Sequence, residues 1–174
     1  SSVDGLDFSS GSASGLLIHA VENGDTGAVR VLLSLGVDAD FRRGNEHRRG
    51  NTPLMMAAIA GRLDIVQLLL KSGAAISKVA GEGGETALTY AATNGHDRTA
   101  LALIENGANP NRSTGVMGKT PLKAAVRAGR SRMTRLLLEQ GAIPGTEGFN
   151  APMRIARRKG YDGIERILRN STQY

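Results

Sequence analysis

Apolar and small side chains recur along most of the chain in short stretches that each end at a glycine. Five such stretches align without gaps, and their glycines are Gly24, Gly61, Gly95, Gly129 and Gly160. Successive glycines lie 37, 34, 34 and 31 residues apart. A near-constant period of about 20 to 50 residues is typical of a protein built from stacked structural repeats.

The pattern inside each unit predicts two short helices joined by a turn. Leu54, Ala57 and Ala58 are spaced by three and one residues, as on one face of a helix. The glycine then ends that helix, and a second apolar stretch follows, such as residues 63–71. Neither helix is long enough to be stable alone in water, so neighbouring units must cover each other's apolar faces. A second glycine closes four of the units, at Gly36, Gly73, Gly107 and Gly141.

These units resemble ankyrin repeats. The resemblance is carried by Thr-Pro-Leu or Thr-Ala-Leu at 52–54, 86–88 and 120–122, by the paired alanines that follow, and by GVDAD, GAAIS, GANPN and GAIPG after the second helix. It covers about residues 15–170. It implies an all-α fold, an ankyrin-repeat solenoid of stacked helix-turn-helix units with hairpin-like fingers between them.

Five repeats are expected within residues 15–171, the first and last being atypical caps. Before them, residues 1–14 are rich in Ser and Gly, and we interpret them as a flexible tail or linker. The predicted units run over about 15–47, 48–81, 82–115, 116–146 and 147–171.

Composition restricts both the core and the compartment. The 174 residues are 40% hydrophobic but only 3% aromatic, so the core must be built from Leu, Ile, Val, Ala and Met. The absence of Cys excludes disulfides, thiol nucleophiles and cysteine zinc sites. No apolar run reaches the roughly 18 residues that a membrane span needs, and no signal peptide is visible. We therefore expect an intracellular protein, cytoplasmic or nuclear.

Charge is distributed unevenly along the chain. Residues 1–118 hold 10 Lys and Arg against 12 Asp and Glu, whereas residues 119–174 hold 12 against 4, a net charge of +8. A basic end of this kind attracts acidic partners over long range.

No catalytic residue, metal site or cofactor is predicted. The three histidines lie in different units without a paired carboxylate or a second ligand at helical spacing. His96 follows a helix-ending glycine, where His is common in the resembled family, and we interpret it as structural. The segment GVMGKT at 115–120 lacks the first glycine and the preceding strand of a phosphate-binding loop.

An insertion of four residues lengthens the first finger and carries the segment FRRGNEHRRGN at 41–51. It can be simply a solvated hairpin tip. Alternatively, its guanidinium groups could bind an acidic peptide or phosphates. The arginines concerned are Arg42, Arg43, Arg48 and Arg49.

The resemblance also implies that the first helices line a concave face where partners bind. The side chains that would bind a partner there run from apolar to polar to basic along the stack. They are Met56, Ile59, Tyr90, Thr93, Asn94, Arg127, Arg158 and Lys159, and Ala124 and Ile155 are expected to be exposed at the position of Tyr90 in later units. Met56 and Ile59 could instead pack between helices, and the basic residues could be the polar coat of a cap.

Three functions are compatible with the sequence. The first is a non-enzymatic, monomeric scaffold or adaptor that binds another protein, with an acidic region of the partner at the basic repeats. The second is electrostatic binding of nucleic acid or anionic lipid, although few aromatic residues are available to stack bases. The third is a regulatory module of a larger enzyme. No small-molecule substrate is expected.

We predict moderate thermal stability. The resembled family usually has His after Thr-Pro-Leu, where it ties adjacent units together, but here that place holds Ile18, Met55, Thr89, Lys123 and Arg154. With that network lost, the melting temperature should lie below about 90 °C, the usual mark of hyperstability. Differential scanning calorimetry tests this, and a transition above that temperature would show that other contacts compensate.

Overall fold

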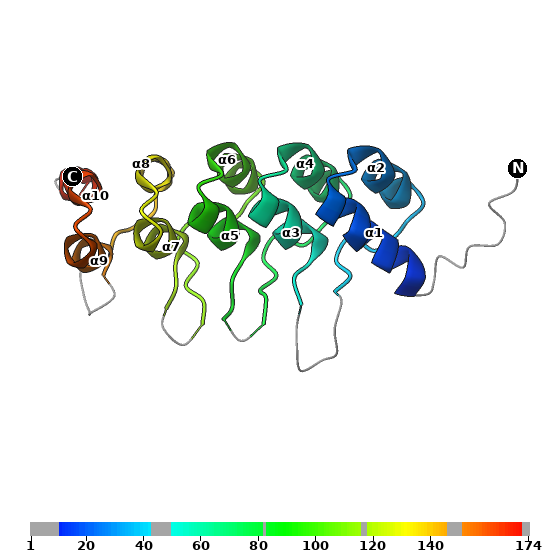
Figure 1. Cartoon of the computed structure of the whole chain (residues 1–174), viewed down its shortest axis with the longest axis horizontal. Coiled ribbons are helices and arrows are strands. Elements are labelled where there is room, and N and C mark those ends of the chain that lie inside the picture. Colours follow the sequence, from blue (N-terminus) through cyan, green and yellow to red (C-terminus); the bar gives the residue numbers. More distant parts are fainter. Residues whose placement is uncertain (1–10, 43–49, 82, 116–117, 146–150, 172–174) are drawn as a thin grey trace, which may run out of the picture.

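The computed structural model describes residues 11–42, 50–81, 83–115, 118–145 and 151–171. This part of the chain holds ten helices and no strand longer than an isolated bridge. The helices form five consecutive antiparallel pairs (Figure 1). Their bounds are α1 Gly11–Asn23, α2 Thr26–Ser34, α3 Pro53–Ala60, α4 Leu63–Lys71, α5 Ala87–Asn94, α6 Asp97–Glu105, α7 Pro121–Arg127, α8 Ser131–Glu139, α9 Pro152–Lys159 and α10 Asp162–Ser171.

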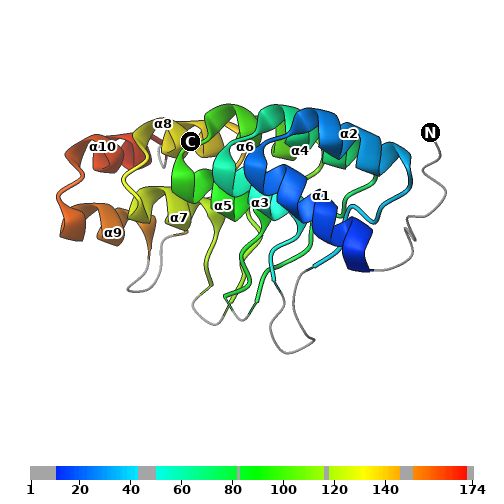
Figure 2. The same cartoon turned by 45° about the vertical axis from the view of Figure 1, so that its right-hand side comes forward.

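The pairs are stacked side by side in chain order, so the helices form two rows. We call α1, α3, α5, α7 and α9 the inner row, and α2, α4, α6, α8 and α10 the outer row. The segments between pairs project as fingers on the side of the inner row (Figures 1 and 2). The stack confirms the predicted all-α solenoid of helix-turn-helix units.

Threonine caps begin three of the inner helices, at the start of the Thr-Pro-Leu and Thr-Ala-Leu motifs. The hydroxyl of Thr52 accepts a hydrogen bond from the backbone N–H of Met55 at 3.3 Å, and Thr86 and Thr120 cap α5 and α7 in the same way. At the other end, Gly61 terminates α3 with a backbone φ of +68°. A residue with a side chain is strained in this left-handed conformation, which accounts for the repeated glycine.

The core lies between successive pairs. Ala57, Ala58, Ala91 and Ala92 have no exposed surface, nor have leucines of the outer row such as Leu69. Alanines let the backbones of neighbouring inner helices come close, and the branched side chains fill the space between the two rows. The core is therefore continuous through the described stack.

The side chain that follows each helix-ending glycine contacts the preceding unit. Nε2 of His96 lies 3.0 Å from the carbonyl oxygen of Ile59, and a Cβ on Gly61 would come within 2.5 Å of the His96 ring. Arg130 repeats this contact one unit later, since its Nε donates to the carbonyl of Thr93 at 3.1 Å. The interpretation of His96 as structural agrees with this geometry.

In three units, the residue at the position where the family usually has His forms a hydrogen bond within its own unit. Sδ of Met55 accepts from the N–H of Thr52 at 3.5 Å, and the hydroxyl of Thr89 bonds that of Thr86 at 3.0 Å. Nζ of Lys123 donates to the carbonyl of Gly118 at 2.9 Å. These bonds stay within one unit, so they do not tie neighbours together.

The second and third fingers are hairpin-like. Ala80 pairs with Glu85, and Thr114 pairs with Lys119, each through an isolated antiparallel bridge. The tips of these fingers touch, because a Cβ on Gly84 would lie 2.9 Å from the backbone nitrogen of Gly115. The predicted boundaries at 81/82 and 115/116 fall at these tips.

The first helix differs from the expectation of a tail over residues 1–14. It begins at Gly11, and Ala13 is buried with 3% of its surface exposed. This start is not predicted from the sequence because Gly and Ser dominate the first turn of α1 and have weak helical preference. Packing of Ala13 against the core stabilises that turn. Residues 1–10 lie outside the described residues.

The residue four positions after the glycine that closes a unit accepts a hydrogen bond from the next unit in two places but not in a third. The Asp40 carboxylate accepts from the N–H of Ala75 at 3.0 Å, and Oδ1 of Asn111 accepts from the N–H of Ile143 at 2.7 Å. Ser77 occupies the same position in the second unit, and its side chain is too short to reach the next unit. A cavity of about 190 Å³ lies there, lined by Ser77 and Asn109 among others.

We predict that Ser77→Asn stabilises the protein. The longer amide would enter the cavity and accept from the N–H of Asn109, as Asn111 does one unit later. One added hydrogen bond of this kind should raise the free energy of unfolding by about 0.5–1.5 kcal/mol, measured by urea denaturation. Asn111→Ser, the reverse change, should lower it by a similar amount. A Ser77→Asn variant no more stable than the parent would contradict the bridging role.

Candidate interaction surface

The side chains predicted to contact a partner lie along the inner row, but their exposure differs. At the N-terminal end, Met56 and Ile59 of α3 are partly exposed. Met56 packs against the core, and the carbonyl of Ile59 accepts the bond from His96. Both interpretations therefore apply to Met56: it contributes to the interface between units and still presents part of its thioether to solvent.

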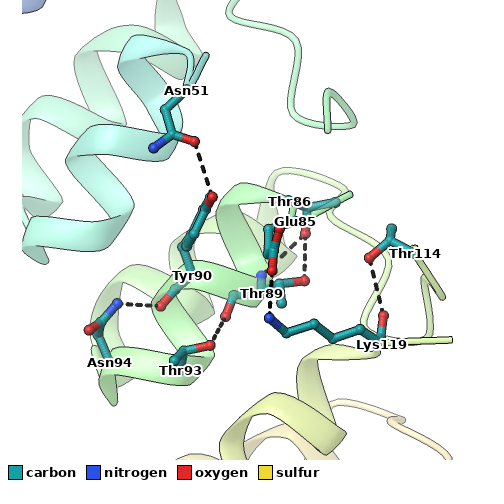
Figure 3. A network of polar contacts seen from close by, with 9 residues as sticks. All are labelled: Asn51, Glu85, Thr86, Thr89, Tyr90, Thr93, Asn94, Thr114 and Lys119. Carbon is teal, nitrogen blue, oxygen red and sulfur yellow. Dashed lines mark hydrogen bonds and ion pairs between the residues drawn. The ribbon is translucent and has the colours of Figure 1, made fainter. Parts of the chain in front are cut away.

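Tyr90 of α5 is fixed in place by its neighbours (Figure 3). Its ring packs partly against the core, and its hydroxyl donates to Oδ1 of Asn51 at 3.1 Å. Burial raises the pKa of the Tyr90 hydroxyl, and the nearby negative charge of Glu85 acts in the same direction. Tyr90 is thus a rigid, half-buried aromatic group rather than a free one.

Two polar residues after Tyr90 each donate one side-chain hydrogen bond to their own helix. The hydroxyl of Thr93 donates to the carbonyl of Thr89, and Nδ2 of Asn94 donates to the carbonyl of Tyr90, both at 2.9 Å (Figure 3). The Thr93 hydroxyl is thereby left as an acceptor, whereas the Asn94 amide keeps its oxygen and a second N–H.

An ion pair joins the second and third fingers beside Tyr90. Nζ of Lys119 lies 2.6 Å from Oε1 of Glu85, and the carbonyl of Lys119 accepts from the hydroxyl of Thr114 (Figure 3). The hydrogen bond and positive charge of Lys119 hold the pKa of Glu85 below its ordinary value. Our sequence reasoning missed this pair. The signal was present, since Asn51, Glu85 and Lys119 each precede the capping threonine of their unit.

The C-terminal end of the inner row is basic and open to solvent. Arg127 of α7 and Arg158 and Lys159 of α9 are all exposed, as predicted from the helical positions. Nζ of Lys159 lies 5.8 Å from the centroid of the Tyr161 ring, within range of a cation–π contact.

Not every arginine of the last pair faces a partner site. Arg157 and Arg169 both bond Oε1 of Glu165, at 3.0 Å and 2.6 Å, and the Arg157 bond is the largest cause of the lowered pKa of Glu165. The Arg157 bond joins α9 to α10, whereas Arg169 pairs with Glu165 within α10.

Two expectations about exposure were wrong. Ala124 and Ile155 occupy the position of Tyr90 in the next two units, yet they expose only 3% and 0% of their surface. This position lies at the edge of the interface between inner helices. A tyrosine ring reaches past that edge to solvent, whereas the methyl group of alanine and the apolar side chain of isoleucine stay inside it.

Of the four finger arginines, only Arg42 lies within the described residues. Its guanidinium donates to the carbonyl of Val79 in the next finger at 2.7 Å, and the side chain is half-buried. This bond gives Arg42 a role in joining fingers, so it corrects the view of Arg42 as simply a solvated group. Arg43, Arg48 and Arg49 lie outside the described residues, and their role stays a prediction.

Within the described residues, no group of three or more His, Asp or Glu side chains is arranged to hold a metal ion. His19 instead bonds Asn23, one turn further along α1, at 3.0 Å. In the same part of the chain, none of the helices combines the length and apolar character that a transmembrane span requires.

We predict that the Glu85–Lys119 pair makes stability depend on pH. Because the folded-state pKa of Glu85 is lowered, the pair stabilises the protein above the ordinary glutamate pKa. The contribution is lost as pH falls through the lowered value. Both side chains are partly exposed, so the effect should be at most about 1 kcal/mol. In urea titrations between neutral and acidic pH, Lys119→Met should lose this dependence, and an unchanged profile would refute it.

Comparison with known proteins agrees with the stacked architecture. The family described as ankyrin repeats in three copies matches residues 17–114 and, in a second alignment, 78–148. Together the two alignments include α2 to α8 completely, and α1 without its first turn and a half. They end before α9.

Three curated relatives are similar over shorter stretches. Inversin from Mus musculus is 40% identical over 72 residues, which are 41% of this chain and 6% of the relative. Inversin from Canis lupus familiaris is 39% identical over 72 residues, with the same shares of the two chains. The 2-5A-dependent ribonuclease of Mus musculus is 50% identical over 58 residues, 33% of this chain and 8% of the relative. The chain thus matches less than a tenth of each relative's length, and on the family match it belongs to the ankyrin-repeat family.

Proposed function

We propose that the chain is a non-enzymatic interaction module that binds an extended segment of another protein along the inner row and the fingers. Ankyrin repeats in general mediate binding between proteins, and each helix pair here contributes one rung of a continuous surface.

The apolar anchor of the partner would bind near Met56, Ile59 and Tyr90. Tyr90 is supported by the core and by Asn51, so a partner that packs on its ring pays little conformational entropy to order it. Met56 is partly exposed beside the same interface, and a thioether adapts to partners of different shape. Half-buried aromatic groups of this kind are frequent hot spots of binding.

Acidic residues of the partner would lie further along the row, toward Arg127, Arg158 and Lys159. All three side chains are exposed on consecutive inner helices, in the part of the chain that carries a net charge of +8. Their charges would accelerate encounter with an acidic segment and fix its direction on the row. The passage from an apolar to a basic surface along one row is the observation that carries the proposal.

The same net charge favours a second candidate, electrostatic binding of nucleic acid or anionic lipid. Salt separates the two functions. Binding to nucleic acid through six to ten phosphate contacts weakens by about 10³–10⁵ between 50 and 200 mM salt, whereas an apolar anchor keeps most of its affinity. A regulatory role beside a catalytic domain is a third candidate, suggested by the ribonuclease relative.

We predict that two changes on the inner row weaken the partner. Tyr90→Ala removes the anchor and Arg127→Glu reverses a charge, and each should weaken binding at least about tenfold, or 1.4 kcal/mol. The partner would be captured from the native source, identified, and its affinity for each purified variant measured by calorimetry at 200 mM salt.

Matched variants control for folding and for charge. Tyr90→Phe keeps the ring and should bind within about twofold, while Arg98→Glu makes the same charge change at an exposed position of the outer row. If Tyr90→Ala and Arg127→Glu both bind like the parent, the inner row is not the site. If binding disappears at 200 mM salt and nucleic acid competes, the second candidate replaces the first.

A further inference from the structure

The outer row has an open groove at its C-terminal end that the inner-row proposal does not use. It lies between α8 and α10, which are neighbours in the outer row and are seen nearly end-on in Figure 1. Its volume is about 760 Å³. Leu138 and Ile167, both partly exposed, provide its apolar part, and Ser131, Arg135, Gly163 and Arg166 are among the residues around them.

Gly163 opens this groove without being required by the fold. It lies in the first turn of α10, and its backbone φ is outside the left-handed region. A Cβ built on Gly163 would meet no atom within 4 Å. Glycine within a helix costs up to about 1 kcal/mol relative to alanine, so neither backbone conformation nor close packing explains it. Asp64, Arg98 and Arg132 occupy the same place in the three middle units, whereas the first unit has Gly27 there.

Two arginines flank the groove from opposite helices. Arg135 of α8 and Arg166 of α10 each stand six residues after the glycine that ends the inner helix of their unit. Both are exposed, and neither guanidinium makes a hydrogen bond or ion pair with the described residues. Glu139 is the one carboxylate among the lining residues, and the surrounding residues 119–174 carry a net charge of +8.

We propose that this groove is a second docking surface, which takes an acidic amphipathic helix of a partner protein. Leucine-like side chains of that helix would cover Leu138 and Ile167, and carboxylates beside them would pair with Arg135 and Arg166. Guanidinium groups suit this role because they bind carboxylates with two parallel hydrogen bonds.

The length of the groove favours a helix over an extended strand. The two walls, α8 and α10, have 9 and 10 residues. At 1.5 Å per residue each is about 14–15 Å long, the length of roughly three turns of a bound helix. Such a helix would place apolar side chains at spacings of three and four residues along the groove.

Charge alone would also attract nucleic acid, but the lining argues for a protein. None of the lining residues is aromatic, so the groove lacks the aromatic platform on which proteins that bind single strands usually stack bases. The apolar contacts of Leu138 and Ile167 would have no counterpart in a phosphate backbone. The groove lies on the opposite row from Tyr90 and Arg127, so its occupancy does not depend on the inner-row function.

The test uses the full chain and a designed probe. The probe is an acetylated, amidated peptide of about 14 residues with leucines at spacings of three and four and glutamates beside them. Its affinity would be measured by fluorescence anisotropy at about 100 mM salt, and its site by amide chemical-shift mapping. We expect saturable binding with the largest shifts at Gly163 and Ile167, and at least tenfold weaker binding when glutamine replaces each glutamate.

Variants separate the groove from general electrostatic attraction. Gly163→Leu fills the groove and should weaken binding of the probe at least tenfold, while the melting temperature of the protein stays the same or rises. Arg135→Glu combined with Arg166→Glu should weaken it equally. Arg30→Glu is the matched control, since Arg30 holds the same position in α2, and it should bind within about twofold of the parent.

Several results would overturn the proposal. They are absence of saturable binding, shifts centred on the inner row, or parental affinity in Gly163→Leu. If the double arginine variant or the glutamine peptide binds unchanged, the partner need not be acidic and the proposed chemistry fails. If a single-stranded oligonucleotide displaces the probe and binds more tightly, nucleic acid is the ligand.

Discussion

Burial of small apolar side chains between successive helix pairs is the interaction on which the whole molecule depends. The helices have 7 to 13 residues, too few to persist alone in water. They are stable because Ala57, Ala91 and Ala125 lose all exposed surface against the next unit. A unit therefore folds only with its neighbours, and a change at one interface affects every surface residue that the adjoining units carry.

That packing fixes the spacing of units, and the spacing aligns side chains that are distant in sequence. Asn51, Glu85 and Lys119 occupy one position in three units, so they lie in a row beside the inner helices. Within that row, Asn51 holds the Tyr90 hydroxyl and Glu85 pairs with Lys119. The stack keeps the spacing of equivalent positions nearly constant, and the surface chemistry differs with the residues that occupy them.

Sequence reasoning identified the features that depend on local pattern. Helix pairs and terminal glycines each follow from a backbone requirement that a single unit expresses. It could not identify features that depend on the reach of one side chain into the next unit. Periodicity assigned Ala124 and Tyr90 to one position, but only the size of each side chain decides which of them reaches solvent. The bond from Arg42 to Val79 joins two units, and the groove beside Gly163 is lined by two units. The pattern within a single unit does not contain either feature.

The positive charge of the C-terminal end acts on both rows of helices, whereas the shape of the surface differs between them. A net charge of +8 over residues 119–174 extends its field to either side of the stack, so it raises the encounter rate of any acidic partner without choosing between the rows. The choice must come from short-range contacts, which differ. The inner row offers the ring of Tyr90, supported from behind by Asn51, whereas the outer row offers a groove beside Leu138 and Ile167. Because residence time depends mainly on such desolvated contacts, partners with similar charge would dissociate at different rates from the two proposed surfaces.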